Sequence, residues 1–180
     1  MSNRILIKSI VVLVVICLVI SGALAVVNHF TAPVIRQARA EREMQSRQAL
    51  IPQAAEFKFL PVEGFPASVT AADLALDADG RPVGYVFRAE GKGFNGTIVV
   101  MAAIDGSGRL MQVSTVDVTS ETATLGGQAA KESYTAQYQG VDASLEGVNA
   151  ISGATVTSKA YEQCVLDCFT AFQTVKEAEK

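Results

Sequence analysis

The sequence is poor in the side chains that most hydrolases use for catalysis. It has one histidine, His29, among 180 residues, and this histidine follows an apolar run near the N-terminus. A hydrolytic triad needs a base beside its nucleophile, so a triad is excluded unless a lysine replaces histidine. Ser152, in Ile-Ser-Gly, does not form the Gly-x-Ser-x-Gly elbow of serine hydrolases. We therefore expect no catalytic residue that acts alone on a small substrate.

Cysteine is scarce as well, which argues against a disulfide framework and against a metal site. Cys17 lies inside the N-terminal apolar run, and Cys164 and Cys168 are one helical turn apart. That spacing is awkward for a disulfide. No further cysteine or usefully placed histidine accompanies the pair, so we expect buried core thiols and no metal.

A concentrated basic face is also missing. The chain has 15 Lys and Arg against 18 Asp and Glu, a formal net charge of −3. Nucleic-acid binding requires clustered positive charge, and no basic cluster is present beyond a mixed Arg/Glu segment after the apolar run. We therefore expect no nucleic-acid partner.

What the chain does have is a long uncharged run from Ser9 to Val27, 19 residues rich in Ile, Val and Leu. As a helix it would span roughly 28 Å, close to the hydrocarbon thickness of a bilayer. This predicts an N-terminal membrane anchor over residues 1–30. A cleaved signal peptide, with Ala23-Leu24-Ala25 as the cleavage site, is the alternative. Under both interpretations the domain that follows is translocated to the far side of the membrane.

The distribution of Lys and Arg does not fix the orientation by itself. Two basic residues precede the apolar run and four follow it, so a plain count favours the opposite orientation. However, residues 28–35 carry no Lys or Arg, and a large domain can translocate regardless of charge. The basic residues are Arg4 and Lys8 before the run, and Arg36, Arg39, Arg42 and Arg47 after it.

Residues 31–70 are predicted to form a juxtamembrane helix and a linker. Thr31-Ala32-Pro33 is typical of a helix start, and Val34 to Leu50 has helical periodicity that Pro52 ends. The helix is either a solvated spacer or a lateral contact for partner subunits. Phe57 to Thr70 is expected to be irregular or to form a short edge strand.

The remainder, residues 71–180, is predicted to be one small α+β domain with a mainly antiparallel sheet and flanking helices. The turn at Asp79-Gly80-Arg81-Pro82 precedes three predicted strands, and Asp105 to Gly108 joins the last two as a hairpin. A helix is expected around Gln128 to Glu132, and another from Ala160 to Val175. The predicted strands are Val83–Ala89, Thr97–Ile104 and Leu110–Val118.

A glycine-rich segment, Gly91-Lys92-Gly93-Phe94-Asn95-Gly96, lies between the first two of these strands. It matches G-x-G-x-x-G, the dinucleotide fingerprint, but that fingerprint has its meaning only where a helix follows. Here a strand is predicted to follow, so we reject a dinucleotide site. The glycines instead predict a close approach of backbone to a neighbouring group.

The most informative stretch is Ile151 to Ser158, Ile-Ser-Gly-Ala-Thr-Val-Thr-Ser. Gly153 permits a sharp turn, and a cluster of hydroxyls then stands where the last helix begins. Such hydroxyls normally cap the helix, while the same free N–H groups also stabilise a phosphate. A hydroxyl here is therefore a cap, a hydrogen-bond donor or a point of esterification, and the residues alone leave all three open.

Ser-Gly-Ala-Thr followed by Val-Thr-Ser resembles the flavinylation motif of the FMN-binding domain family. Within that family the chain is most similar to the G subunit of the Rnf electron-transport complex and the C subunit of the sodium-pumping quinone reductase. The resemblance implies FMN joined through a phosphoester to the threonine that matches here, Thr155. Thr157 and Ser158 remain alternative attachment points.

Other segments carry the resemblance with departures. Ser120 to Gly127 resembles the family's Glu-Thr-Pro-Gly-Leu-Gly loop against the flavin, although Ala123 replaces Pro and Thr124 replaces Gly, and Asn149 stands where Asp is common. Gly84-Tyr85 and the glycine-rich segment resemble a pattern that shapes the flavin pocket. The resemblance thus implies these cofactor-binding residues besides Thr155: Ser152, Gly153, Ala154, Thr157, Ser158, Gly84, Tyr85, Gly96, Glu121, Thr122, Leu125 and Gly126.

The function that the resemblance implies is electron transfer. We expect a single-pass subunit of the cell (inner) membrane with its FMN domain outside, relaying electrons between ferredoxin and NAD redox in a complex that transports cations. Its implied partners are the other membrane subunits and a flavin transferase, and it would not complete the reaction alone. The alternatives are a C-type subunit of the quinone reductase, or an unflavinylated membrane-anchored binding domain.

Overall fold

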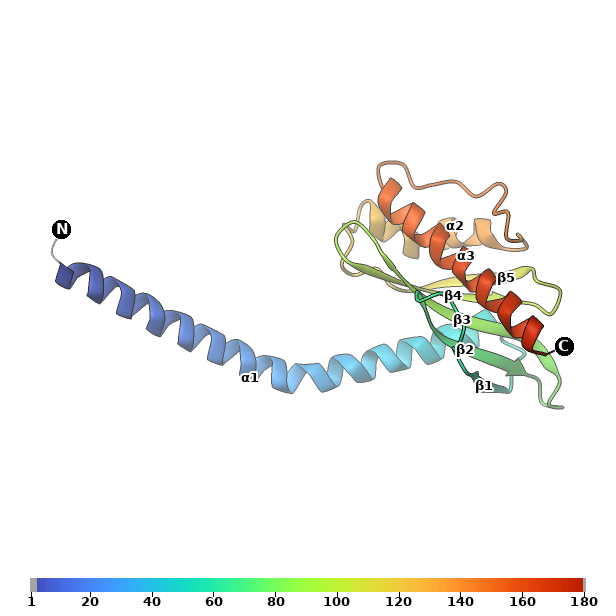
Figure 1. Ribbon diagram of the computed structural model, residues 1–180, viewed down its shortest axis with the longest axis horizontal. Coiled ribbons are helices and arrows are strands. Elements are labelled where there is room, and N and C mark those ends of the chain that lie inside the picture. The colour runs from blue at the N-terminus through green and yellow to red at the C-terminus, as the bar shows by residue number, and fades with distance from the viewer. Residues whose placement is uncertain (1–2, 180) are drawn as a thin grey trace. The chain divides into compact units, whose positions relative to one another are not determined.

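The computed structural model describes residues 3–179, in two compact units that meet between Arg42 and Glu43. The side chains of Arg4 and Arg39, which entered the charge count, lie outside the described part. In chain order the helices and strands are α1 (Asn3–Leu50), β1 (Glu56–Leu60), β2 (Val69–Leu76), β3 (Pro82–Lys92), β4 (Thr97–Ile104), β5 (Leu110–Asp117), η1 (Gly126–Ala130), α2 (Glu132–Thr135), η2 (Ala136–Tyr138) and α3 (Thr155–Ala178) (Figure 1).

The first unit is the N-terminal part of α1, and α1 is the one helix in the described residues that is long and apolar enough to cross a membrane. The predicted helix start at Pro33 is wrong, because α1 continues through Pro33 without a break. A proline costs the helix one N–H donor. The regular helix on either side outweighs that loss, and Thr31 adds a bond from its hydroxyl to the Val27 carbonyl (2.9 Å).

The second unit is built on a five-stranded antiparallel sheet in the order β1-β2-β3-β4-β5. Each strand pairs with its neighbour in sequence, so the sheet is a simple meander, and the predicted α+β class is confirmed. The three predicted strands correspond to β3, β4 and β5. The edge strand expected after Phe57 is β1, whereas β2 was not predicted.

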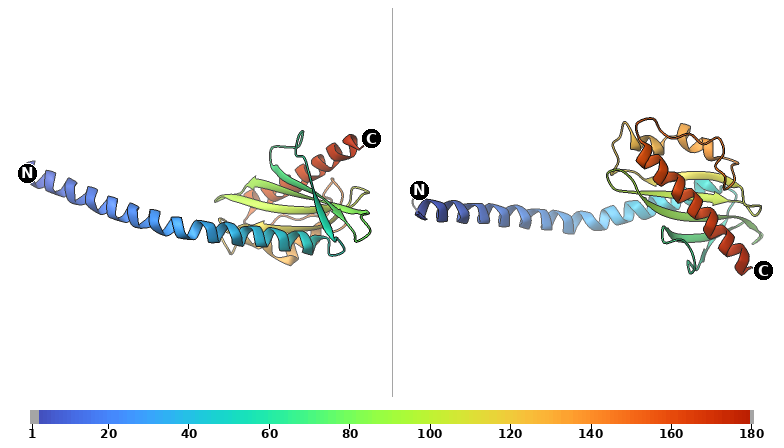
Figure 2. Two further views of the ribbon diagram at one scale, coloured as in Figure 1. Left: turned by 90° about the horizontal axis from the view of Figure 1, so that it is seen from below. Right: turned by 45° about the horizontal axis from the view of Figure 1, so that its top comes forward.

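The two faces of the sheet carry separate apolar clusters. Alternate residues of β3 point to opposite faces, so Phe87 packs in the cluster that contains α3, while Val86 packs in the cluster that contains the end of α1. The short helices η1, α2 and η2 contribute to the α3 side. Figure 2 shows α3 lying across one face of the sheet.

The predicted apolar face of the last helix is confirmed, although α3 begins at Thr155, about one and a half turns before the predicted start. Cys164 and Cys168 are free thiols within the core. Burial raises the pKa of Cys164 to about 12, so this thiol stays protonated and unreactive near neutrality. The residues of the face, all buried, are Tyr161, Cys164, Val165, Cys168, Phe169, Phe172 and Val175.

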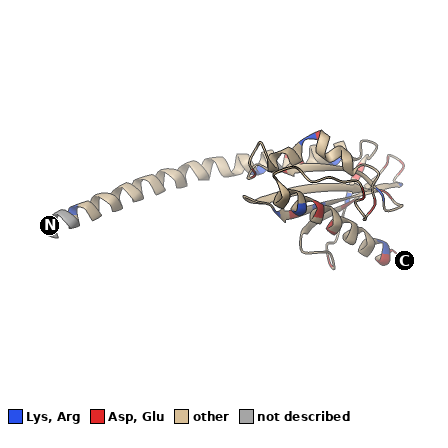
Figure 3. Ribbon diagram, turned by 90° about the horizontal axis from the view of Figure 1, so that it is seen from above, with Lys and Arg blue, Asp and Glu red and all other residues tan. Residues whose placement is uncertain are grey.

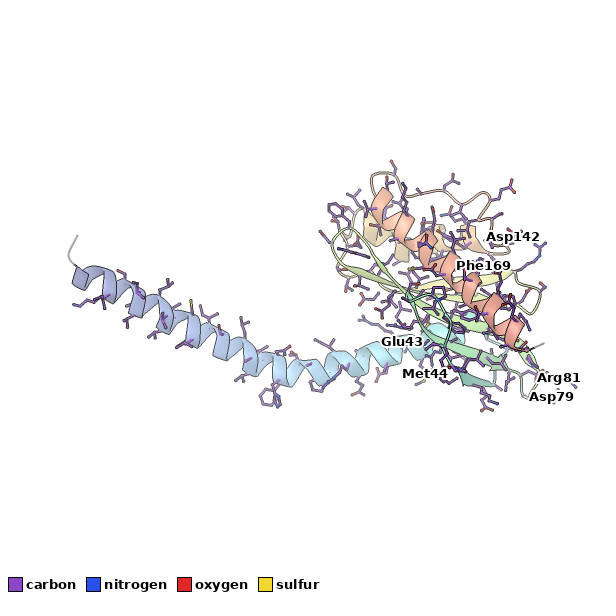
Figure 4. The ribbon with its side chains drawn as sticks, viewed as in Figure 1. Glu43, Met44, Asp79, Arg81, Asp142 and Phe169 are labelled. Atoms are coloured by element: carbon purple, nitrogen blue, oxygen red, sulfur yellow. The ribbon has the colours of Figure 1, made fainter. Side chains whose placement is uncertain are left out.

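The last turns of α1 belong to the second unit. Glu43, labelled in Figure 4, pairs with Arg88 of β3 at 3.1 Å, and Arg47 pairs with the buried Asp73 of β2 at 3.1 Å. Leu50, with Ile51 just after the helix, is buried in the cluster on this face. The compact unit therefore begins at Glu43, earlier than the boundary at residue 71 that we expected.

Two predicted turns are confirmed and one predicted helix is corrected. Asp79 and Arg81, labelled in Figure 4, lie in the β2–β3 turn, and their charged groups are 3.3 Å apart. The hairpin joining β4 and β5 closes with the Gly108 N–H donating to the Asp105 carbonyl (3.1 Å). The helix expected around Gln128 is instead the 3-10 turn η1 followed by the single turn α2, because Lys131 between them is extended.

Charges are mixed over the second unit. In Figure 3 blue and red positions alternate on it, while α1 is uncharged between Lys8 and Arg36. This mixture follows from the near balance of 15 Lys and Arg against 18 Asp and Glu in the sequence.

Candidate functional site

The start of α3 is shaped by a turn that leaves backbone donors free. Gly153 has φ +77°, a conformation that L side chains rarely adopt, and Ala154 after it is the non-helical N-cap of α3. The first intrahelical bond is donated by the Ser158 N–H to the Ala154 carbonyl (2.9 Å). The three N–H groups ahead of it, on residues 155–157, have no carbonyl within the helix. They point out of its N-terminal end.

The three hydroxyls of this turn occupy different environments. Thr155 is exposed, whereas Thr157 and Ser158 are 1% and 0% exposed. Thr157 donates to Glu121 Oε2 (2.6 Å), and Ser158 accepts from the Ile151 N–H (2.9 Å). No side chain caps α3, so the helix-cap interpretation of Thr155 is wrong: Thr155 is already the first helical residue.

A cavity of about 320 Å³ adjoins this turn. Three large apolar side chains stand at it with much of their surface exposed: Phe94 (71%), Val156 (51%) and Leu125 (42%). Exposed apolar groups around a concave site are typical of a ligand pocket. The full lining is Phe94, Glu121, Thr122, Leu125, Gly126, Gly153, Ala154, Thr155, Val156 and Thr157.

Glu121 is the buried charge of this cavity. Its Oε1 accepts from the Asn95 N–H of the β3–β4 loop (3.0 Å), and its Oε2 accepts from Thr157. A Cβ on either Gly93 or Gly126 would lie 2.4 Å from a carboxylate oxygen, so the two glycine backbones enclose the carboxylate. Among the described residues no lysine or arginine pairs with Glu121.

The other glycines of the glycine-rich segment also make room for neighbours. A Cβ on Gly91 would lie 2.7 Å from Cys164 Sγ of α3, and one on Gly96 would lie 2.6 Å from Ser120. A strand, β4, follows the segment, as predicted. The glycines therefore permit close packing of α3 and the 120–121 loop, and the rejection of a dinucleotide fingerprint is supported.

The loop after Ser120 is a closed turn. The Thr122 carbonyl accepts from both the Leu125 and Gly127 N–H groups (3.0 Å each). Gln128 in η1 donates to the Thr124 carbonyl (2.6 Å). Thr124, where the family pattern has Gly, thus contributes its backbone to the turn.

Of the expected cofactor residues, Gly84 and Tyr85 do not join the group around Thr155. The Tyr85 hydroxyl accepts from Lys176 (2.8 Å) and donates to Glu179 (2.9 Å), at the C-terminal end of α3. That end is about 30 Å from Thr155 at the rise of a helix. Gly84 faces Ile51 on the opposite side of the sheet.

Two pairs of residues near the turn were not singled out from the sequence. The Tyr134 hydroxyl lies 3.1 Å, oxygen to oxygen, from the Tyr138 hydroxyl. Burial raises the pKa of both phenols, so they remain neutral donors near the turn. Phe94 and Val156 line the cavity at its mouth. Phe94 could have been predicted from the sequence, because a large apolar residue inside a glycine-rich loop indicates a ligand contact.

Asn149, the other departure from the family pattern, lies in the exposed approach to the turn. Its N–H donates to Gln137 Oε1 (2.8 Å), and its carboxamide donates to the Gly147 carbonyl (3.1 Å). The side chain therefore orders its own loop, which leads into Ile151.

Comparison with known proteins agrees with this geometry. The FMN-binding domain family matches residues 93–170, which include the last four residues of the glycine-rich segment, the Glu121 loop and the start of α3. The G subunit of an ion-translocating oxidoreductase complex from Methanosarcina acetivorans is 31% identical over 165 residues, covering 85% of this chain and 87% of its own.

Two further relatives are similar over most of their length. One is the G subunit of a proton-translocating ferredoxin:NAD(+) oxidoreductase complex from Clostridium ljungdahlii, 28% identical over 82% of this chain and 81% of its own. The other is the G subunit of a Na(+)-translocating ferredoxin:NAD(+) oxidoreductase complex from Acetobacterium woodii, 26% identical over 83% of each chain.

The anchor helix, the sheet domain and the apolar cavity at the start of α3 together define a single-pass membrane flavoprotein with an FMN-binding domain. Its cofactor is FMN, and its relatives are subunits of multi-subunit complexes. The chain belongs to the family of G subunits of ion-translocating oxidoreductase complexes.

Proposed function

We propose that this protein is an electron-transfer subunit that carries FMN through a phosphoester to Thr155. In this proposal it relays electrons between ferredoxin and NAD redox within a membrane complex that transports cations. The observation that carries the attachment is the environment of Thr155: its hydroxyl is exposed, at the first position of α3 and on the lining of the cavity.

The residues present fit the two parts of FMN. A phosphate ester at Thr155 would lie beside the free N–H groups and the positive end of the α3 dipole, which stabilise a phosphate. Lys159 is exposed one helical turn after Thr155, on the same side of α3, and adds a positive charge. The exposed apolar surfaces of Phe94, Leu125 and Val156 suit a flat aromatic ring system.

The flavin supplies the redox chemistry when bound, and the chain supplies its position. A rigid attachment matters because an electron carrier must present its ring at a fixed place to its donor and acceptor. Here the turn before α3 is fixed by Ser158, and α3 itself is fixed by its buried face over most of its length. The protein thereby limits the motion of a covalently held flavin.

The proposal includes partners and a location. The complexes to which the relatives belong imply other membrane subunits, and covalent attachment requires a flavin transferase. We place the FMN domain on the outer side of the membrane, as the family resemblance implies; residues 28–35, which carry no Lys or Arg, are compatible with this orientation. Labelling of Ser107→Cys by a membrane-impermeant maleimide in intact cells tests this orientation.

The experiment that tests the attachment is flavin fluorescence of the denatured full chain in a gel, after co-expression with a flavin transferase. We expect fluorescence in the wild type and none in Thr155→Ala. Thr155→Ser is the matched control, because it keeps a hydroxyl at the same position. Peptide mass spectrometry then identifies the modified residue.

Each result decides between the alternatives. Fluorescence that survives in Thr155→Ala would move the attachment to Thr157 or Ser158. A wild-type band without fluorescence would favour a membrane-anchored binding domain that is not flavinylated. Reconstitution with ferredoxin and NAD, or with a quinone, separates the proposed complex from a sodium-pumping quinone reductase.

A further inference from the structure

Glu121 connects two segments that are far apart in the sequence and that both line the cavity. The first is the β3–β4 loop, which carries Phe94 and is bound through the Asn95 N–H (3.0 Å). The second is the first turn of α3, bound through the Thr157 hydroxyl (2.6 Å). One carboxylate thus sets the spacing between the aromatic wall of the cavity and the turn that bears Thr155.

The surroundings leave this carboxylate little freedom. Glu121 is 8% exposed, and the backbones of Gly93 and Gly126 approach it so closely that neither position has room for a Cβ. A buried carboxylate is costly unless donors satisfy it. With no cation paired to it among the described residues, its two oxygens depend on the Asn95 N–H and the Thr157 hydroxyl.

We propose that Glu121 is the positioning residue of the flavin site: it holds the Phe94 loop against the first turn of α3 and occupies the Thr157 hydroxyl, leaving Thr155 as the hydroxyl open to esterification. This inference rests on the proposed covalent attachment of FMN. It adds a reason for the choice among three neighbouring hydroxyls. Ser158 is removed from the choice independently, because it is 0% exposed and its hydroxyl oxygen accepts from the Ile151 N–H.

The esterification that Glu121 directs balances with a flavin dinucleotide as donor. A bond forms between Thr155 Oγ1 and the phosphorus of the FMN half, and the anhydride bond of the donor breaks. The hydroxyl proton leaves to solvent or base, and a nucleoside monophosphate departs. The buried hydroxyl of Thr157 cannot approach such a donor while it donates to Glu121.

The test compares Glu121→Ala with Glu121→Gln in the full chain. Glutamine has the same shape and supplies an oxygen to Asn95 and an amide group to Thr157, whose hydroxyl can also accept. We expect Glu121→Ala to lower the initial rate of FMN incorporation by about tenfold, as for the loss of one hydrogen bond to a charged group. Glu121→Gln should remain within about threefold of wild type, since both contacts persist.

A second measurement, on protein without flavin, reports the contact itself. Amide hydrogen exchange at Asn95 should be protected in wild type and in Glu121→Gln, and should accelerate in Glu121→Ala. A role limited to general stability would not single out this amide. If Glu121→Ala does not fold, Thr157→Val and Thr157→Ser replace it, because valine removes the hydroxyl at nearly constant volume and serine keeps it.

The outcomes are distinguishable. A wild-type incorporation rate in Glu121→Ala, or in Thr157→Val, would overturn the inference while leaving covalent FMN at Thr155 intact. Unchanged Asn95 exchange in Glu121→Ala would overturn it as well. A wild-type chain that takes up no flavin would overturn the proposed function, and the Asn95 exchange would still show whether Glu121 joins the two segments. Slow incorporation and fast exchange in the alanine variant, restored in the glutamine variant, support the inference.

Discussion

At the scale of single residues, the site depends on the absence of a side chain at its glycines. Gly126 has an ordinary backbone conformation, so its φ angle gives no reason for glycine. Its reason is space, because a Cβ there would lie 2.4 Å from Glu121 Oε2 and 2.7 Å from Thr157 Oγ1. The absent side chain permits the hydrogen bond between those two residues.

This makes Gly126→Ala a sensitive substitution. We expect it to lower the free energy of unfolding by about 1–3 kcal/mol, the usual cost of overpacking a buried site. Thermal unfolding of the full chain in detergent measures the loss. Gly106→Ala is the control, since a Cβ there meets nothing within 4 Å and no positive φ is required. An equal effect of both substitutions would contradict the steric explanation.

The resemblance of the sequence to a flavinylation motif selected Thr155, but not the environments of its neighbours. A helix turns about 100° per residue, so the first helical residue decides which hydroxyls face the core. That residue depends on the turn at Gly153 and Ala154, whose geometry the sequence permits without specifying. Glu121 was expected at the cofactor, whereas its two partners come from distant segments and needed the fold.

At the scale of elements, the end of α1 is joined to the sheet by charge as well as by apolar packing. Asp73 of β2 is buried and lies 3.1 Å from Arg47 of α1. The pKa of Asp73 is raised above its ordinary value of 3.8, because burial outweighs the opposing effect of Arg47. The ion pair therefore orients the helix at a net cost for the ionised carboxylate.

A pH dependence follows with a definite sign. A carboxyl group with a raised pKa in the folded state favours folding most below its unfolded value, and this contribution is lost as pH rises through the folded value. We expect the stability of wild type relative to Asp73→Asn to fall as the pH rises above the ordinary aspartate pKa of 3.8, because the unfolded carboxyl ionises more readily than the buried one. Denaturant unfolding at increasing pH measures it. A relative stability that rises with pH would show that Arg47 dominates instead.

Elements with a regular pattern were predicted well, and those fixed by context were not. β3, β4 and β5 are rich in apolar residues, and Asp-Gly turns precede β3 and join β4 to β5. The apolar residues of α3 recur with a clear helical period. β2 contains several small residues and the acidic Asp73, and the acidic Asp77 directly follows it, so its sequence does not have a typical strand pattern. It forms a strand because it pairs with β1 and β3. Likewise Pro33 resembled a helix start, although a long helix tolerates one lost donor.

At the scale of the whole molecule, the chain divides differently from a simple anchor, linker and domain. The second compact unit begins inside α1, at Glu43. It takes Leu50, Ile51 and Ala54 into a buried cluster against the sheet face opposite α3. The part of α1 from Glu43 onward is therefore part of the folded unit that carries the flavin site.

This division predicts which shortened chains fold. A chain of residues 43–180 should be soluble without detergent and unfold cooperatively, because it keeps both apolar clusters and lacks the membrane run. A chain of residues 55–180 loses Leu50 and Ile51, each worth about 1.5–3 kcal/mol when buried. That loss, about 3–6 kcal/mol in all, approaches the total stability of about 5–15 kcal/mol that a domain has. Urea unfolding followed by circular dichroism compares the two, and equal stability would show that the end of α1 is only a spacer.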